Sequence, residues 1–80
     1  MFEDCIIRYE VIAWVDAENP QRPCYMQTFR SKALAVKQAR SVSRRYPLVE
    51  VNENKINAND PNDLREGKLL ASWTHGRKTA

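Results

Sequence analysis

This 80-residue chain has few of the residues that catalytic motifs require. Its two glycines, Gly67 and Gly76, cannot build a glycine-rich phosphate loop, which needs several closely spaced glycines. Its single histidine, His75, has no serine or cysteine at a recognisable catalytic spacing, and we expect it to be an exposed residue at a strand end. The sequence therefore predicts a protein that is not an enzyme and has no catalytic residue.

Cysteine is scarce as well. Cys5 and Cys24 are too few for a disulfide framework, and they do not form a CxxC pair. One histidine and two separated cysteines do not readily supply the four ligands of a zinc site, so we expect neither a metal nor a cofactor. We interpret both cysteines as small buried apolar residues in strands. Pairing between molecules through an exposed thiol is the alternative.

Long hydrophobic runs are absent. No run approaches the roughly 18 to 20 apolar residues that span a bilayer, and residues 1–4 are acidic where a signal peptide would be basic. A hydrophobic content of 42% with only two glycines and four prolines is typical of a globular chain. We expect one domain over residues 1–80, in the cytoplasm and without a membrane partner, with residues 76–80 as a basic, frayed tail.

Acidic residues are missing from one long stretch of the chain. Between Glu18 and Glu50 there is no Asp or Glu, and all ten acids lie outside this stretch. The formal net charge of +3 therefore conceals a polarised molecule, and a field of one sign acts on partners rather than on folding. The stretch holds seven of the thirteen cations: Arg22, Arg30, Lys32, Lys37, Arg40, Arg44 and Arg45.

The first half of the chain carries clear structural periodicity. Residues 5–16 alternate with a period of two and predict a strand whose odd positions face the core. Two prolines make residues 17–23 a loop, so residues 24–30 are expected to form a second strand that pairs with the first. Ser31 is a suitable helix N-cap, and an apolar stripe predicts a helix that continues until Pro47. The stripe consists of Ala35, Ala39, Val42 and Tyr46.

The second half predicts two further strands. Residues 48–52 read as a strand with Val49 and Val51 facing inward, and residues 68–75 as a strand with Leu69, Ala71 and Trp73 on one face. We interpret the asparagine-rich residues 52–67 between them as a loop with one helical turn at residues 63–67. The order β-β-α-β-β predicts an α+β fold in which one helix packs on a mainly antiparallel sheet of four strands.

The predicted helix concentrates cations on one face. Lys37, Arg40 and Arg44 lie at i, i+3 and i+7, opposite the alanine stripe, with Arg45 beside them. A solvated face is the simpler interpretation. However, such faces usually mix both signs, and like charges at this spacing slightly destabilise a helix. We therefore expect a binding role for this face.

Aromatic side chains are a second candidate feature. Ile12 and Trp14 lie on the even face of the first strand, and Tyr25 is a candidate to join them. A flat ring near an arginine serves as an interface anchor or as a platform for a stacked base. The alternative is that the helix, a loop or a partner subunit covers these rings. The candidate partner-binding residues are Lys37, Arg40, Arg44, Arg45, Arg30, Arg22, Trp14 and Tyr25.

Two kinds of acidic partner suit such residues. DNA or RNA would need cations that follow its phosphates. However, the chain has no helix-turn-helix, zinc-finger or RNP-type signature, and its acidic segments would repel a long duplex. An acidic protein surface, or a protein groove that otherwise takes nucleic acid, requires only complementarity over a patch of standard size. We expect a protein partner first and nucleic acid as the alternative.

The layout resembles a known group of proteins. The resemblance rests on Ser31-x-x-x-Ala35-x-x-x-Ala39 with Lys37 on the open side, on the Val49/Val51 strand and on residues 69–73, and it covers roughly residues 24–75. On these features the chain resembles small phage-encoded anti-CRISPR proteins that inhibit type I systems.

The resemblance implies a non-enzymatic inhibitor in the host bacterial cytoplasm that binds a CRISPR surveillance complex and blocks target DNA binding. Lys37, Arg40 and Arg44 would then meet acidic residues of a Cas subunit or nucleic acid held in the complex. The alternative is a small regulatory protein that binds nucleic acid through the same face. For either function we expect a monomer or a weak homodimer.

Overall fold

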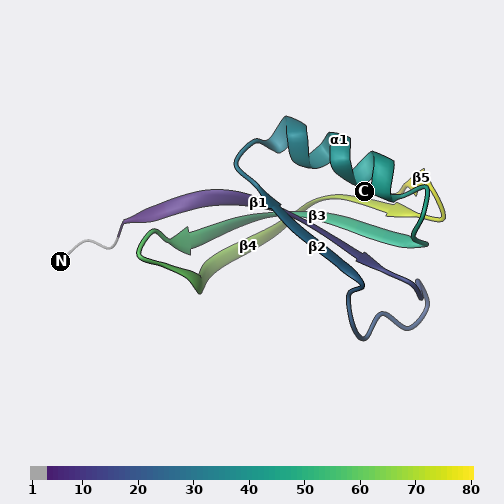
Figure 1. Cartoon of the computed structure of the whole chain (residues 1–80), viewed down its shortest axis with the longest axis horizontal. Coiled ribbons are helices and arrows are strands. Elements are labelled where there is room, and N and C mark those ends of the chain that lie inside the picture. Colours follow the sequence, from purple (N-terminus) through teal and green to yellow (C-terminus); the bar gives the residue numbers. More distant parts are fainter. Residues whose placement is uncertain (1–3) are drawn as a thin grey trace.

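In a computed structural model that describes residues 4–80, one helix packs on one face of a five-stranded antiparallel sheet, as Figure 1 shows. The strands lie in the order β2-β1-β3-β4-β5. The predicted α+β class is confirmed, but the sheet has five strands where we expected four. Residues 1–3, which belong to the acidic start, lie outside the described part. The elements are β1 (Cys5–Trp14), β2 (Tyr25–Phe29), α1 (Lys32–Val42), β3 (Leu48–Asn57), β4 (Asp60–Thr74) and β5 (Arg77–Lys78).

Strand β1 follows the predicted alternation. Val11 and Ala13 are fully buried under α1, while Ile12 lies on the opposite face of the sheet. The strand ends at Trp14, two residues earlier than expected, because the Asp16 carboxylate accepts hydrogen bonds from the amides of Glu18 and Asn19 at 2.9 and 3.1 Å. This side-chain turn directs the chain away from the sheet. Strand β2 then pairs antiparallel with β1, which confirms the predicted hairpin.

Helix α1 begins as predicted and ends early. The Ser31 hydroxyl accepts a hydrogen bond from the amide of Leu34 at 3.4 Å, which confirms Ser31 as the N-cap. The helix ends at Val42 rather than at Pro47, with Ser43 as the C-cap. The Ser43 hydroxyl donates to the Arg40 carbonyl at 2.6 Å, and a residue that precedes proline disfavours the helical conformation. Residues 43–45 therefore form a turn.

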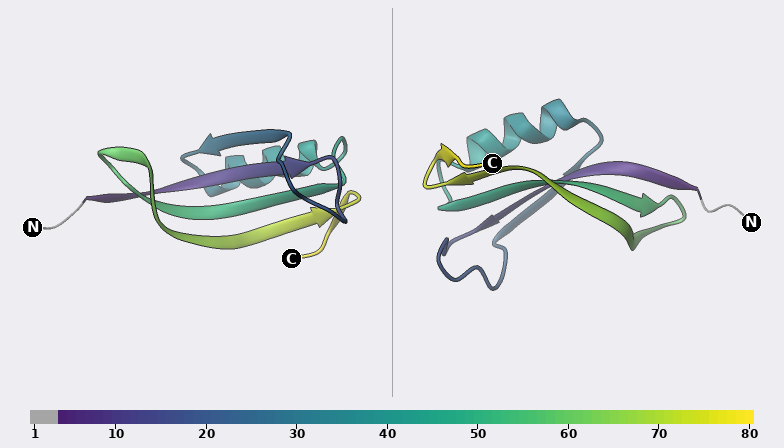
Figure 2. Two further views of the ribbon diagram at one scale, coloured as in Figure 1. Left: turned by 90° about the horizontal axis from the view of Figure 1, so that it is seen from below. Right: turned by 180° about the vertical axis from the view of Figure 1, so that it is seen from behind.

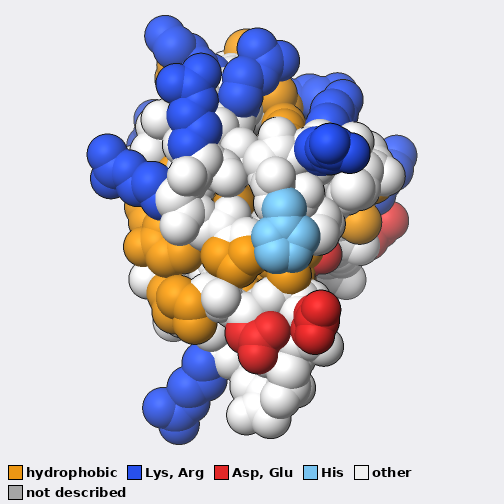
Figure 3. Space-filling model, turned by 90° about the vertical axis from the view of Figure 1, so that its right-hand side faces the viewer, with side chains coloured by type: hydrophobic (Ala, Val, Ile, Leu, Met, Phe, Trp, Pro, Cys, Tyr) orange, Lys and Arg blue, Asp and Glu red, His pale blue; other side chains and the backbone are white. Residues whose placement is uncertain are grey.

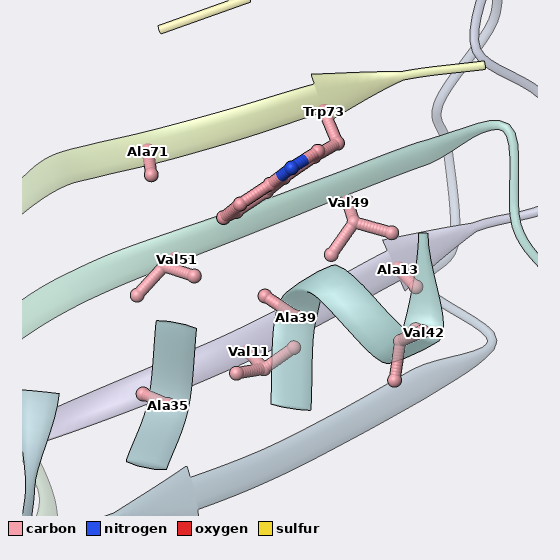
Figure 4. Packing of buried hydrophobic residues seen from close by; sticks show 9 residues of the cluster. All are labelled: Val11, Ala13, Ala35, Ala39, Val42, Val49, Val51, Ala71 and Trp73. Carbon is pink, nitrogen blue, oxygen red and sulfur yellow. The ribbon is translucent and has the colours of Figure 1, made fainter. Parts of the chain in front are cut away.

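The core lies between α1 and the three strands beneath it, β1, β3 and β4. Figure 4 shows the Trp73 indole extending from β4 across β3, beside the valines that point from β3 toward the helix. Trp73 is 4% exposed and supplies most of the bulk on this side of the core. The buried cluster consists of Val11, Ala13, Ala35, Ala39, Val42, Val49, Val51, Ala71 and Trp73.

Ala39 should not tolerate a larger side chain. It is 0% exposed on the core face of α1, and its small size lets the helix approach the strands closely. We expect Ala39→Leu to lower the free energy of unfolding by about 1 to 3 kcal/mol, because the added atoms displace neighbouring side chains. Urea unfolding followed by circular dichroism measures this. Ala33→Leu on the exposed face of α1 is the control and should change it by less than about 0.5 kcal/mol.

Strand β4 corrects one predicted face. Ala71 and Trp73 face the core as expected, but Leu69 lies on the other face and is 48% exposed. The register shifts between Val51, which pairs with Ala71, and Asn52, which pairs with Leu69. Leu70 is the extra residue of this β-bulge and packs against the core in place of Leu69.

The asparagine-rich segment is not a loop. β3 continues to Asn57 and β4 begins at Asp60, so this segment forms a long hairpin and the helical turn expected at residues 63–67 is a strand. Figure 1 shows that the outer halves of β1, β3 and β4 extend beyond α1 as an arm. Because α1 covers neither face of the arm, the residues of the arm do not need to alternate between apolar and polar. The sequence therefore lacks the period of two that would have predicted a strand here.

The C-terminal residues return to the sheet. His75 and Gly76 both have positive φ, 51° and 81°, and they connect β4 to β5 as a two-residue hairpin turn. Residues 77–78, which we expected in a frayed tail, form β5, and the amide of Thr79 donates to the Ser72 carbonyl at 2.7 Å. Among residues 4–80, no helix has the length and apolar character needed to cross a membrane.

Candidate interaction surface

The outer face of α1 carries the first group of cations. Lys37 and Arg40 are exposed on the side of the helix opposite the buried alanines. Together with Lys32 they surround a shallow groove of about 600 Å³ whose apolar part is Ala33 and Val36. The groove has aliphatic walls and charged ends, which suits a partner that presents carboxylates or phosphates beside apolar surface.

The two flanks of α1 differ in charge. The Gln38 amide donates to the Tyr25 hydroxyl at 3.1 Å, so the Gln38 flank faces β2. Leu34 and Ser41 lie at i−4 and i+3 from Gln38 and share this flank, which is uncharged within α1. Arg45, in the turn after the helix, borders a pocket on this flank with Tyr25, Gln38 and Ser41. The cations of α1 therefore lie on its outer face and on the flank turned away from β2.

The turn after α1 carries the second group of cations. Arg44 and Arg45 are exposed and border a cleft of about 510 Å³ that His75 and Gly76 close from the other side. The amide of His75 donates to the Pro47 carbonyl at 2.7 Å, which joins the β4–β5 turn to the turn after the helix. Two guanidinium groups and an imidazole thus lie around one cleft. They can donate several hydrogen bonds to a single anionic group.

Sequence reasoning missed His75 as part of this surface. It is thirty positions from Arg45 in the chain, and only pairing of β3 with β4 brings the two turns together. The available signal was the His-Gly pair between a strand and a basic segment, which is typical of a two-residue hairpin turn. The left-handed backbone of His75 is uncommon for a residue that is not glycine, although histidine tolerates it better than most.

Strand β5 extends the basic surface. Lys78 is exposed and pairs with Trp73, which places it on the helix side of the sheet, whereas Arg77 pairs with Thr74 and lies on the opposite face. Figure 3 views this end of the molecule, where most Lys and Arg side chains lie in the upper part, around α1, and the Asp and Glu side chains lie beside and below the histidine. We call the exposed cations of the helix side the basic surface: Lys32, Lys37, Arg40, Arg44, Arg45 and Lys78.

None of these cations forms an ion pair with another described residue. The ion pair that the described chain does contain joins Arg65 and Asp63, at 2.9 Å, in β4. Arg40 in the last turn of α1 interacts favourably with the helix dipole. The repulsion between neighbouring like charges on a helix is only about 0.2 to 0.5 kcal/mol per pair. The fold therefore tolerates the clustering, and the charges remain available to a partner.

Two predicted cations do not belong to the basic surface. Arg22 lies in the loop after β1, where it borders a small pocket of about 250 Å³ with Trp14 and Cys24. Arg30 is exposed just after β2, before the N-cap of α1. The acid-free stretch is thus contiguous in sequence but divided in space.

Tyr25 does not join Trp14. It pairs with Ala13 in the β1–β2 ladder, which places it on the core face, and its ring centre lies 6.3 Å from that of Tyr46. Its hydroxyl donates to the Gln27 side chain and accepts from Gln38. The expectation that Tyr25 joins Ile12 and Trp14 on one face is wrong, because register decides the face of every residue in a strand.

The face of the sheet opposite α1 is a separate surface. Ile12 and Trp14 lie on it, beside Leu48 and Met26, and no described helix or strand covers it, as the left view of Figure 2 shows. The loop after β1 lies against Trp14 at one end of this face. Glu10 and Glu50 lie on the same face. Trp14 is half-buried and close to Arg22. The aromatic and basic candidates therefore belong to opposite sides of the sheet rather than to one site.

The remaining reactive side chains form no site among residues 4–80. Cys5 is half-buried and Cys24 is exposed, so the expectation of two buried cysteines is wrong. Cys24 lies one residue before β2, and its amide donates to the Ala13 carbonyl of β1 at 2.7 Å. No described group of three His, Cys, Asp or Glu residues is arranged to bind a metal ion. No protein-family model matches the chain, and no curated protein or solved structure is significantly similar to it.

Proposed function

We propose that this protein is a non-enzymatic inhibitor that binds a macromolecular partner through its basic surface. The observation that carries the proposal is the group of exposed cations on the outer face of α1, at the cleft of residues 43–47 and at Lys78, none of which pairs with an acid among residues 4–80. A surface of this kind binds by complementarity of charge over an area, which supplies specificity and a fast association rate.

The extent of the basic surface favours a large partner over a small molecule. Lys32 and Arg40 are separated by eight residues of α1, about 12 Å along the helix, and Arg44 and Arg45 lie beyond them at the cleft. The groove and the cleft both open onto the outer surface of the protein. Several anionic groups at fixed spacing, on a protein or a nucleic acid, would engage such an arrangement together.

The specific form of the proposal is an anti-CRISPR-type protein. The layout of Ser31, Ala35 and Ala39 with Lys37 on the outer face supports it, as does the resemblance that rests on these residues. In this form the basic surface would meet acidic residues of a Cas subunit, or nucleic acid held in a type I surveillance complex, and would block the entry of target DNA. The setting would be the cytoplasm of the host bacterium.

A small nucleic-acid-binding protein is the second candidate. The cleft between Arg44, Arg45 and His75 favours it, because guanidinium groups bind phosphate oxygens well. The carboxylates of Glu10 and Glu50 on the opposite face would not prevent contact with a single strand that follows α1. Free DNA would then bind without any protein partner.

Binding assays with free DNA and with a surveillance complex distinguish the two candidates. For the inhibitor, we expect capture of a type I surveillance complex that survives nuclease treatment and no shift of a 30-base-pair duplex at physiological salt. Tight binding to free DNA that weakens steeply with salt, as phosphate contacts do, would favour the second candidate and contradict the first. Capture of the complex that disappears with nuclease would assign the contact to nucleic acid rather than to a Cas subunit, and the duplex shift then decides between nucleic acid held in the complex and free DNA.

A further inference from the structure

Strand β2 presents an open edge of the sheet. It is the outermost strand on its side, and within residues 4–80 no strand pairs with its outer edge, as the left view of Figure 2 shows. Proteins usually protect such edges with charged residues, proline or a bulge. Residues 25–29 contain no charge and no proline, and their pairing with β1 is regular. The backbone groups on this edge are therefore ready to pair with another strand.

Apolar side chains lie on both sides of this edge. Met26 is 60% exposed on the open face of the sheet, opposite Ile12 of β1. Leu34 is 57% exposed on the flank of α1 that faces β2, one helical turn before Gln38, which bonds to Tyr25. A strand added at this edge would thus be covered by a leucine above and a methionine below.

The sequence of β2 is complementary to itself. If two copies pair antiparallel about Gln27, Tyr25 of one lies opposite Phe29 of the other, and Met26 lies opposite Thr28. Aromatic pairs and β-branched neighbours are favourable across strands. In a two-fold symmetric pair of identical strands, each favourable contact occurs twice. A strand of unrelated sequence would not be expected to repeat these contacts.

The distribution of charge permits this pairing. Two molecules that each carry a formal charge of +3 repel one another unless their cations are kept apart. The cations of α1 lie away from β2, and in this register Arg30 of one copy would lie opposite Cys24 of the other. Within α1, the β2 side carries no cation, and the one cation of the basic surface near β2 is Arg45, which borders a pocket with Tyr25 and Gln38 at the end of the helix.

We propose that the protein forms a two-fold symmetric dimer by antiparallel pairing of β2 with β2 of a second copy. The two sheets join into one, both helices lie on the same side, and the Leu34 side chains of the two copies face each other across the seam. The two basic surfaces then point outward. The dimer stands independently of the proposed function, but it would present two basic surfaces to one partner and raise the effective affinity.

Sedimentation equilibrium of the whole chain tests the dimer. We expect a reversible dimer with a dissociation constant of roughly 1 to 100 μM, since the seam is short compared with a standard interface. Met26→Lys and Leu34→Lys should each raise this constant at least tenfold. Leu69→Lys, which adds the same charge to the same sheet far from β2, should leave it unchanged. Circular dichroism verifies that each variant folds.

Cross-linking tests the register. In a Cys5→Ser, Cys24→Ser background, Gln27→Cys should form an intermolecular disulfide on mild oxidation, because the two Cα atoms would be directly opposite. Thr28→Cys should not, since in this register the two Cα atoms are separated diagonally by roughly 7 to 8 Å. A protein that stays monomeric at millimolar concentration, a dimer insensitive to Met26→Lys, or equal cross-linking at positions 27 and 28 would each overturn the proposal. Loss of partner binding alone would leave it standing.

Discussion

Reversing the charge of Lys37 and Arg40 together should abolish binding to the macromolecular partner and leave the fold intact. Both side chains are exposed on the outer face of α1 and form no contact that the core needs. Two carboxylates at these positions would repel the acidic groups that the cations now attract, and juxtaposed like charges cost several kcal/mol at an interface. We expect the affinity to fall by about 100-fold or more, measured by isothermal titration calorimetry with the purified complex.

A matched control separates a local effect from a change in net charge. Arg22→Glu with Lys55→Glu alters the net charge by the same amount, but these residues lie in the loop after β1 and in the arm. This variant should retain most of the affinity, with a smaller loss through long-range steering that salt removes. If the Lys37/Arg40 variant binds like the unaltered protein, the basic surface is not the site. If both variants lose affinity equally, only the net charge matters.

Truncating Trp73 should cause the largest loss of stability of any single substitution. The indole is 4% exposed and fills the space between β4, β3 and α1, as Figure 4 shows. We expect Trp73→Ala to lower the free energy of unfolding by about 3 to 5 kcal/mol, because the transfer energy of the ring is lost and a cavity remains. Small domains are stable by only about 5 to 15 kcal/mol, so a large part of the molecules would unfold near physiological temperature.

Urea unfolding of both tryptophan variants measures this. Trp14→Ala is the control, since Trp14 is only half-buried on the uncovered face of the sheet, and its loss should be about 1 to 2 kcal/mol. Each variant keeps a single tryptophan, so its fluorescence reports on one side of the sheet. A loss below about 1 kcal/mol for Trp73→Ala would show that the core does not depend on the indole in the way described.

The part of the fold covered by α1 was predictable from the sequence. Val11, Ala13, Val49 and Val51 alternate with residues of the other face, and they lie on the core side of the sheet as expected. Ser31 is the N-cap of the helix because its hydroxyl accepts a hydrogen bond from the amide of Leu34, three positions later. An element that is buried on one face shows a periodic pattern of apolar residues in its sequence. A helix cap involves residues only three positions apart, so it too can be predicted from the sequence.

The arm and the bulge were not predictable in this way. Residues 52–57 and 60–67 form strands without facing α1, so their sequence carries no apolar period, and their asparagines indicate a loop instead. The shift at Leu70 reverses the face of the residues that precede it in β4, including Leu69, as far as the next shift, between Lys55 and Ile56 of β3. A bulge depends on how two strands twist together, and nothing in the alternation of β4 itself marks it.

For the candidate site, the sequence by itself determined which residues the helix face carries and the sign of its charge. The absence of acids from residues 19–49, with Lys37 and Arg40 opposite the alanine stripe, requires a cationic helix face in any fold that buries the alanines. Tertiary structure alone decided the extent of the surface. Pairing of β3 with β4 and of β4 with β5 brings His75 beside Arg44 and adds Lys78 of β5, while the register of β2 turns Tyr25 toward the core. Helix faces follow from the local period of the backbone, whereas strand neighbours depend on register and turns between segments distant in sequence.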